Sequence, residues 1–135
     1  MKSYSKSKFN VGDVLFELRY TPSNNYYTLR CLNKKEEMGY ATFKLNGQTA
    51  WLYYICTHPK FQHRGVGFAL LTAIEKFALD NGASRIEGKF YPENEFAKLL
   101  YDKAGYAIEK DGYETLICKN IYQNVSARVP EFEKV

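Results

Sequence analysis

Apolar and polar residues alternate along the first part of the chain, which is the pattern of half-buried β-strands. The alternation predicts four strands, over residues 14–20, 26–32, 39–45 and 49–57. Polar turns separate them, and Asn46-Gly47 before the last of the four is a strong hairpin signal, because a type I′ turn needs positive φ at both central residues. We therefore expect four antiparallel strands first.

The period of the pattern changes after residue 57. Apolar residues then recur three or four positions apart between Gly65 and Asn81, which predicts a helix that ends on Gly82. The remaining predicted elements are a strand, a short helix and a final hairpin: 84–90, 94–105, and 106–110 with 113–120. The expected fold class is α/β (α+β), a mixed, twisted sheet of about seven strands with two main helices in the order ββββαβαββ.

Length and composition agree with one ordinary globular domain. The chain has 135 residues, of which 45% are hydrophobic and 25% charged, which excludes disordered, collagen-like and disulfide-stapled proteins. Its 12 Tyr, 9 Phe and single Trp suit wide sheet surfaces. We expect one domain over 1–122 and a tail over 123–135, which is a loose terminus or an arm that docks on another subunit.

Charge and cysteine usage narrow the function further. The net charge of +4 favours an anionic ligand, but it is too small to indicate a nucleic acid as partner. The sequence shows neither a bilayer-spanning run nor a secretory signal, so we expect a cytoplasmic protein with no membrane partner. The three cysteines, Cys31, Cys56 and Cys118, and the two histidines, His58 and His63, lack the spacing of zinc ligands. We therefore expect no metal, and we expect the three cysteines to be reduced, buried thiols.

A glycine-bearing loop, 59–67, runs straight into the start of the first predicted helix. Unpaired backbone N–H groups and the positive end of the helix dipole suit an anion there, and Lys60 and Arg64 add positive charge. The pattern is equally compatible with an ordinary turn that caps a core helix. A P-loop is excluded, because Phe68 and Ala69 stand where that motif needs Lys and then Ser or Thr.

Two motifs resemble those of a known family. The run Gln62-His63-Arg64-Gly65-Val66-Gly67 resembles the Q/R-x-x-G-x-G/A acetyl-CoA signature of the GNAT superfamily of N-acyltransferases. Residues 94–106 follow the family pattern N-x-x-A-x-x-x-Y-x-K-x-G-F/Y at every anchor. The resemblance covers residues 49–120 in detail. It implies the GNAT fold and transfer of an acetyl group from acetyl-CoA, the co-substrate, to a primary amine by direct attack in a ternary complex.

The resemblance also implies roles for individual residues. The backbone amides of one loop would hold the CoA pyrophosphate: Gln62, His63, Arg64, Gly65, Val66 and Gly67. Main-chain groups of Ile55, Cys56 and Thr57 would pair with the pantetheine arm like an added strand. Asn94, the predicted N-cap of the second helix, would hydrogen-bond the same arm. Tyr101 would be the catalytic residue that donates a proton to the departing CoA thiolate.

Two features depart from the family pattern. Many members carry a glutamate base early on the fourth strand, where this chain reads Ala50-Trp51-Leu52-Tyr53-Tyr54, so Glu87, Tyr53 and an ordered water are the candidate bases. The chain also leaves no room for the helices that usually wall the acceptor site. That site is therefore open or completed by a second subunit of a homodimer. Small amines and protein amines both remain candidate acceptors, and a non-catalytic acyl-CoA-binding module is the alternative function.

Overall fold

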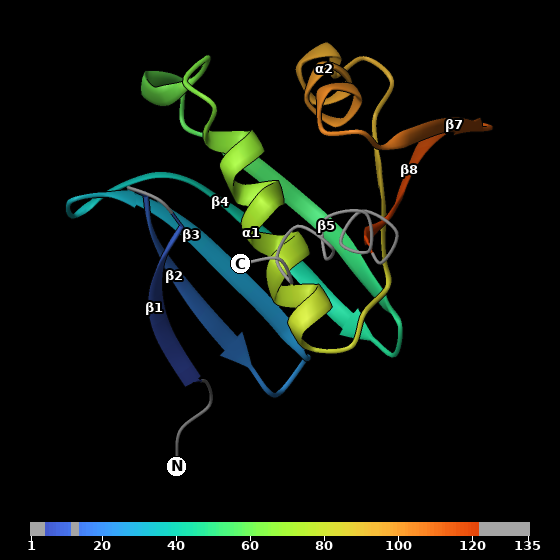
Figure 1. Cartoon of the computed structure of the whole chain (residues 1–135). Helices are drawn as coiled ribbons and strands as arrows, with labels where there is room; N and C mark the ends of the chain where they lie inside the picture. Colours follow the sequence, from blue (N-terminus) through green and yellow to red (C-terminus); the bar gives the residue numbers. More distant parts are fainter. Residues whose placement is uncertain (1–4, 12–13, 122–135) are drawn as a thin grey trace, which may run out of the picture.

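The computed structural model describes residues 5–11 and 14–121, which form one eight-stranded sheet and two α-helices (Figure 1). The strands are β1 (Ser5–Val11), β2 (Val14–Thr21), β3 (Tyr26–Asn33), β4 (Glu36–Asn46), β5 (Thr49–Thr57), β6 (Arg85–Phe90), β7 (Ala107–Asp111) and β8 (Glu114–Asn120). The helices are η1 (Pro59–Phe61), a single 3-10 turn, α1 (Val66–Asp80) and α2 (Glu95–Lys103). The predicted tail, 123–135, lies outside the described residues.

The sheet has the order β1-β2-β3-β4-β5-β6-β8-β7, and every neighbouring pair except β5 and β6 is antiparallel. The predicted class and element order are confirmed, with one strand more than the seven expected. The additional strand is β1, whose sequence, SKSKFNV, shows no amphipathic alternation. It pairs with β2 along its whole length, and Phe9 stacks on Phe16 with 5.5 Å between ring centroids. Backbone pairing at a sheet edge needs little from side chains, so the apolar pattern could not show this strand.

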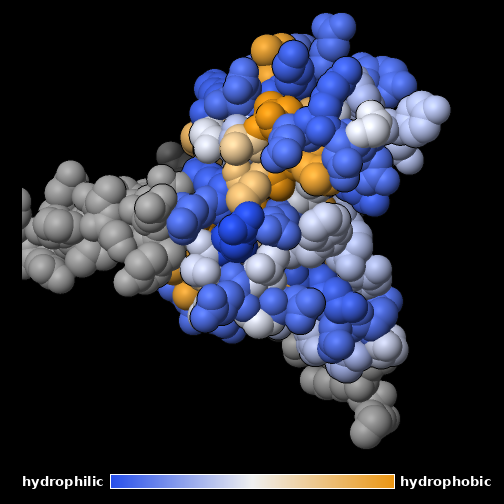
Figure 2. Space-filling model, turned by 90° about the vertical axis from the view of Figure 1, so that its right-hand side faces the viewer, coloured by the Kyte–Doolittle hydropathy of each residue, from blue (hydrophilic) through white to orange (hydrophobic). Residues whose placement is uncertain are grey.

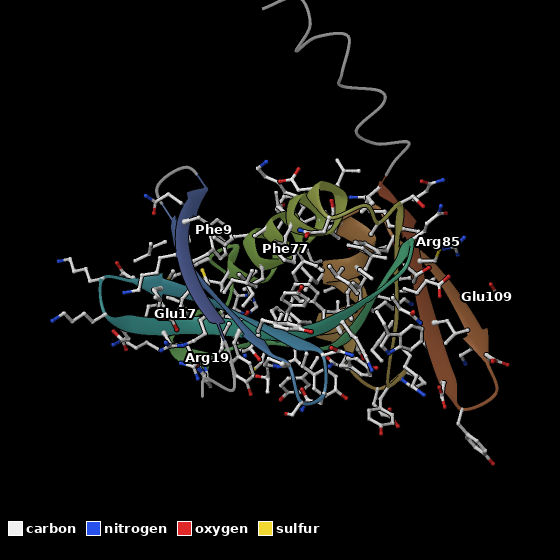
Figure 3. All side chains as sticks on the ribbon, turned by 90° about the horizontal axis from the view of Figure 1, so that it is seen from below. Phe9, Glu17, Arg19, Phe77, Arg85 and Glu109 are labelled. Atoms are coloured by element: carbon white, nitrogen blue, oxygen red, sulfur yellow. The ribbon has the colours of Figure 1, made fainter. Side chains whose placement is uncertain are left out.

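The main core lies between α1 and one face of the sheet. The helix packs against β3, β4 and β5. Its buried side consists of small and branched residues at helical spacing: Val66, Gly67, Leu70, Leu71, Ala73, Ile74 and Ala78. Phe77 reaches from the helix toward the sheet (Figure 3), with 4.9 Å to the Tyr27 ring and 5.8 Å to the Phe43 ring between centroids. Burying one large apolar side chain stabilises a fold by about 1.5–3 kcal/mol, so this layer fixes the position of α1.

The parallel pair β5–β6 is short. It begins with Thr49 opposite Arg85 and ends with Leu52 opposite Gly88. Residues 53–57 continue β5 beyond that point. On the side of β6 they have no partner strand in the described part of the chain. The two strands therefore part, and the main-chain groups on one edge of 53–57 are left without sheet hydrogen bonds.

A β-bulge lies at the point where the strands part. Thr42 pairs with Tyr54 and Phe43 pairs with Leu52, so Tyr53 is the extra residue on β5. Tyr53 and Tyr54 are 44% and 53% exposed, whereas Leu52 is buried in the core. The bulge therefore directs two tyrosines to the face of the sheet that lies away from α1.

The β7–β8 hairpin forms the end of the sheet that lies opposite β1, and it lies beside α2. This side of the molecule is mainly hydrophilic, with hydrophobic side chains gathered in its upper part (Figure 2). The edge strand β7 exposes Glu109, Lys110 and Asp111. Charged side chains on an edge strand oppose pairing with another strand. The sheet is therefore expected to end at β7 and not to extend into a second molecule.

Candidate functional site

The loop between β5 and α1 turns through two residues of positive φ. His63 has a φ of 65°, and Gly65, the residue that caps α1, has a φ of 82°. The buried ring of Phe61 anchors the loop to the core. Apart from its chain neighbours, no described atom lies within 4 Å of the place where a Cβ on Gly65 would stand. The main chain at the start of α1 is therefore accessible to a ligand.

The backbone amides at the start of α1 have no backbone acceptors in the part of the chain that the structure describes. Those of Gly65, Val66 and Gly67 donate to no backbone group of the described residues, whereas the Gln62 amide donates to the Pro59 oxygen at 3.3 Å. Free amides at the positive end of a helix dipole suit an anion. The predicted anion-binding loop thus has its free donors at its α1 end, and the Gln62 amide is already engaged within η1.

The two cations of the loop differ in their partners. The Lys60 ammonium pairs with Glu36 at 3.0 Å. The Arg64 guanidinium lies 5.8 Å from the centroid of the Phe61 ring and forms no ion pair with another described residue. Arg64 is therefore the cation that remains able to neutralise a bound anion beside the free amides.

Gly67 lies where α1 and α2 approach each other. A Cβ at this position would come within 3.0 and 3.3 Å of the two terminal methyl groups of Leu100, on α2. These distances are shorter than most contacts that Cβ atoms make in folded proteins, so a side chain larger than glycine would push against Leu100. The second glycine of the loop motif therefore serves helix packing in addition to any contact with a ligand.

The three residues predicted to line the pantetheine arm lie on the part of β5 that is paired with β4 but not with β6. Register places Ile55 opposite Ala41, Cys56 opposite Tyr40 and Thr57 beyond them at the strand end. Their main-chain groups on the β6 side have no strand partner among the described residues. A strand edge of this kind can accept an extended chain through backbone hydrogen bonds, as in β-augmentation.

Asn94 is the N-cap of α2, as the sequence predicts. Its Oδ1 accepts a hydrogen bond from the Ala97 amide at 3.0 Å, which satisfies one of the free donors of the helix. Its side-chain NH2 group has no partner in the described part of the chain. Only that group is therefore left to donate to a ligand.

Tyr101 lies on the buried side of α2 and is 3% exposed. Its ring contacts those of Phe90, the last residue of β6, and Tyr106, with centroids 5.4 and 5.5 Å away. Its hydroxyl has no hydrogen-bond partner among the described residues. Burial raises the pKa of Tyr101 well above its ordinary value. The hydroxyl therefore stays protonated at neutral pH and can act as a donor.

A partly buried polar cluster begins at Tyr106, whose ring contacts that of Tyr101, and no pattern in the sequence indicated it. The Tyr106 hydroxyl donates to Glu75 Oε2 at 3.0 Å, and Lys119 Nζ lies 3.0 Å from the same oxygen. Lys119 also donates to the Ala104 carbonyl, at the end of α2, at 2.8 Å. The cluster joins α1, β8 and the end of α2, and so it fixes the helix that carries Tyr101.

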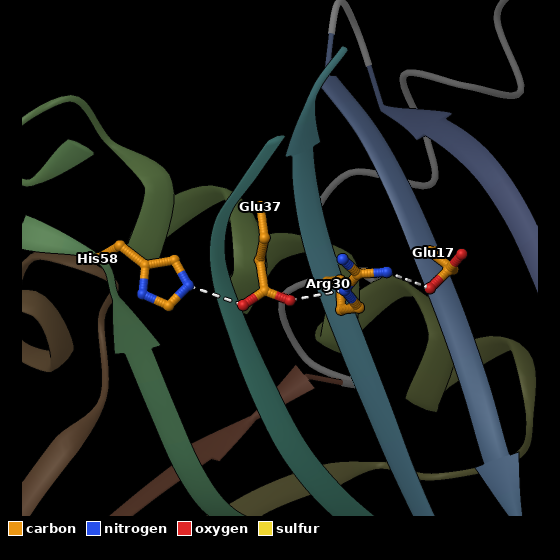
Figure 4. A network of polar contacts seen from close by, with 4 residues as sticks. All are labelled: Glu17, Arg30, Glu37 and His58. Atoms are coloured by element: carbon orange, nitrogen blue, oxygen red, sulfur yellow. Dashed lines mark hydrogen bonds and ion pairs between the residues drawn. The ribbon is translucent and has the colours of Figure 1, made fainter. Parts of the chain in front are cut away.

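A second polar network lies on the sheet face away from α1 (Figure 4). Arg30 Nη1 donates to Glu17 at 2.7 Å and Arg30 Nε donates to Glu37 at 2.6 Å, while His58 Nε2 lies 2.7 Å from Glu37. Burial alone would raise the pKa of Glu37, but the hydrogen bonds from Arg30 and His58 outweigh it and lower that pKa. His58 directly precedes the loop, and its contact with Glu37 ties the loop to β4.

A pocket of about 370 Å³ opens on the same face, over β4, β5 and β6. Its walls are formed by Lys44, Asn46, Thr49, Trp51, Tyr53 and Glu87. Two of the candidate bases, Glu87 and Tyr53, thus lie in one pocket. Glu87 also pairs with Arg85 at 2.8 Å.

The family of the chain follows from its sequence as a whole. A sequence model of the acetyltransferase (GNAT) family matches residues 3–106. The chain belongs to the GNAT acetyltransferase family. The resemblance seen in the two motifs is therefore confirmed.

Solved structures of acetyltransferases share this GNAT fold. The PaiA N-acetyltransferase of Thermoplasma acidophilum, in complex with coenzyme A, is 23% identical with a TM-score of 0.68, over 73% of this chain and 64% of that one. A Bacillus subtilis acetyltransferase in complex with CoA is 16% identical with a TM-score of 0.64, over 72% and 78%. An acetyltransferase of Thermus thermophilus is 25% identical with a TM-score of 0.60, over 71% and 64%. This chain spans less than two thirds of the first and third of these proteins.

The GNAT domain lacks helices on one side of its described sheet. A short turn, 22–25, joins β2 to β3, and α1 and α2 are the α-helices of residues 5–11 and 14–121. Arg19 and Glu17 lie on the face turned away from Phe77 and α1 (Figure 3). The predicted absence of acceptor-site helices between 20 and 26 is therefore what the structure shows, and the pocket over β4, β5 and β6 lies on the uncovered face.

The cysteines of the GNAT domain are free thiols, but they differ in burial. Cys31 is buried, and burial raises its pKa to about 11, whereas Cys56 and Cys118 are partly exposed. The expectation that all three are buried is therefore wrong for two of them, which lie near the surface of the sheet. Within the described residues no three His, Cys, Asp or Glu side chains are grouped to hold a metal ion, and no helix is long and apolar enough to cross a membrane.

Proposed function

We propose that this GNAT domain transfers an acetyl group from acetyl-CoA to a primary amine. The observation that carries the proposal is the parting of β5 from β6, because it leaves a strand edge free beside the unpaired amides at the start of α1. Membership of the GNAT family and the CoA bound in two structures of the same fold support it. A cytoplasmic location and a homodimer stay predictions from the sequence.

The CoA would lie along the loop and β5. The amides of Gly65, Val66 and Gly67 would bind its pyrophosphate, with Arg64 supplying charge and the amides of His63 and Arg64 completing the loop. The pantetheine arm would hydrogen-bond the free edge of β5 at 55–57 like an additional strand. The side-chain NH2 of Asn94 would donate to the same arm from the opposite side.

Acetyl transfer requires attack of the amine on the thioester and departure of the CoA thiolate. The amine nitrogen attacks the thioester carbonyl, a backbone N–H near the bulge at Tyr53 stabilises the oxyanion, and the carbon–sulfur bond then breaks. The thiolate takes its proton from the Tyr101 hydroxyl. The acceptor ammonium first gives one proton to Glu87 or to a water molecule, since β5 carries no carboxylate. The neutral amine then attacks, and the second proton that its nitrogen loses as the amide forms restores the Tyr101 hydroxyl.

The alternative function is an acyl-CoA-binding module without catalysis. The observation that favours it is the replacement of the usual glutamate on β5 by the run Ala50-Trp51-Leu52-Tyr53-Tyr54. Both functions predict saturable binding of acetyl-CoA, so binding alone does not separate them.

Product analysis separates the two functions. The full chain is incubated with acetyl-CoA and a panel of primary amines, and mass spectrometry is used to detect acetylated amine together with released CoA thiol. We expect acetylated amine and CoA thiol in equal amounts, once the thiol that is released in the absence of amine has been subtracted. Saturable acetyl-CoA binding with neither product over the whole panel would establish the binding module instead.

A further inference from the structure

One row of side chains crosses the uncovered face of the sheet at the pocket. Lys44 pairs with Trp51, and Trp51 pairs with Glu87, so the three residues stand side by side on β4, β5 and β6. All three line the pocket. Neighbouring strands are about 4.8 Å apart, which places the backbones of Lys44 and Glu87 roughly 10 Å from each other.

The middle of this row is aromatic. The Trp51 indole lies between the two charged residues, and Tyr53 lies next to it with 6.3 Å between ring centroids. Tyr53 in turn makes an edge contact with Tyr26 at 5.0 Å. These rings offer a hydrocarbon chain a flat apolar surface.

The two ends of the row carry opposite charges. The Lys44 ammonium lies 5.8 Å from the centroid of the Tyr26 ring and forms no ion pair with a described residue. The Glu87 carboxylate shares one ion pair, with Arg85, and is still partly exposed. A ligand with a single positive charge would be repelled by Lys44, and a ligand with a single negative charge would be repelled by Glu87. A ligand with both charges satisfies each end.

We propose that this pocket binds a zwitterionic amine, with its ammonium group at Glu87, its carboxylate at Lys44 and its hydrocarbon chain across Trp51. The ammonium end would lie where β5 and β6 part, because Glu87 precedes Gly88, the last β6 residue paired with β5. The ligand is thus the acetyl acceptor, and this identification rests on the proposed acetyl transfer.

The binding test uses Trp51 itself, the one tryptophan of the chain. Its fluorescence is titrated with three probes of equal carbon number: ε-aminocaproate, hexylamine and hexanoate. We expect ε-aminocaproate to bind about tenfold more tightly than either singly charged probe, because it gains a charged partner at both ends. Equal binding of the three probes, a preference for hexylamine or hexanoate, or no binding would overturn the proposal.

Charge-removing variants assign the two ends. In Lys44→Met, ε-aminocaproate should bind only as well as hexylamine, and in Glu87→Gln only as well as hexanoate. Lys110→Met and Glu109→Gln, on the exposed edge strand β7, are the matched controls and should keep the preference. Thermal unfolding of each variant verifies that it is folded. A preference that survives in either pocket variant would contradict the assigned orientation.

A parallel acetylation assay distinguishes this inference from the proposed function. Acetylation of hexylamine as efficient as that of ε-aminocaproate, in both wild type and Lys44→Met, would refute the zwitterionic acceptor and leave acetyl transfer intact. Tight binding of ε-aminocaproate without acetylation of any amine would refute acetyl transfer and leave the zwitterion-binding pocket intact.

Discussion

Tyr101 is a buried residue whose hydroxyl has no hydrogen-bond acceptor among the described residues. Its ring is held by Phe90 and Tyr106, so the position of the oxygen is fixed by apolar packing and not by a hydrogen bond. Burial raises its pKa, so the group is protonated at neutral pH and is a weaker acid than an exposed tyrosine. Its fixed oxygen can hydrogen-bond the leaving sulfur and give up its proton only as negative charge develops there.

Removing this hydroxyl in Tyr101→Phe should lower kcat while the stability and the acetyl-CoA affinity stay close to wild type. General acid catalysis is worth about 10²- to 10⁴-fold, and a thiolate leaves more readily than an alkoxide, so we expect a loss of roughly ten- to a hundredfold. Steady-state kinetics with a competent amine measures it. Tyr113→Phe, on an exposed turn, is the control. An unchanged kcat with a raised KM for acetyl-CoA would make Tyr101 a binding residue.

Arg64 and Lys60 provide a matched pair in the loop before α1. Arg64 has no ion-pair partner in the described part of the chain, whereas Lys60 is held by Glu36. Arg64→Met should therefore weaken acetyl-CoA binding about ten- to a hundredfold, because charge-assisted contacts to phosphate contribute about 1.5–3 kcal/mol. Lys60→Met should change affinity much less.

Thermal unfolding with and without acetyl-CoA gives the measurement for this pair. Ligand at a hundredfold excess over its dissociation constant stabilises a protein by about 2.7 kcal/mol, so a tenfold loss of affinity is readily resolved. If the two variants lose affinity equally, Arg64 has no special contact with the phosphates.

At the scale of elements, the network of Glu17, Arg30, Glu37 and His58 joins three strands to the loop that precedes α1. Its central carboxylate has a lowered pKa in the folded protein. Glu37 therefore stabilises the fold above the ordinary pKa of a glutamate, about 4.3, and this stabilisation is lost as the pH falls through the folded pKa.

Replacing this carboxylate in Glu37→Gln should cost about 1 kcal/mol of unfolding free energy at neutral pH, because two charged hydrogen bonds become neutral ones. The difference from wild type should shrink as the pH falls below about 4. Urea unfolding across this pH range measures it. Glu36→Gln, which removes only an exposed ion pair, should have a smaller effect. If the difference in unfolding free energy between wild type and Glu37→Gln stays the same at every pH, protonation of Glu37 does not contribute to the pH dependence of stability.

At the scale of the whole molecule, the sequence predicted the elements that its side chains specify. Alternation indicated seven strands, and helical spacing with Gly82 indicated α1. Strand β1 was missed because its pairing depends on backbone groups. The N-cap role of Asn94 was predictable because it is local, whereas Glu75 and Lys119 meet across 44 positions and left no local pattern. The parting of β5 from β6 was equally hidden, since both segments have ordinary strand sequences.

The uncovered face of the sheet also has a kinetic consequence. No described helix or lid has to move before an acceptor reaches the pocket, so association can be limited by diffusion and orientation, and release is not delayed by an opening step. The same openness admits water to the thioester, and slow hydrolysis of acetyl-CoA without any acceptor is the expected side reaction. It also leaves in solvent the side of the acceptor's hydrocarbon chain that faces away from Trp51. Substituents on that side should then be tolerated, so that selectivity resides in the charged groups at the two ends and not in the overall size of the acceptor.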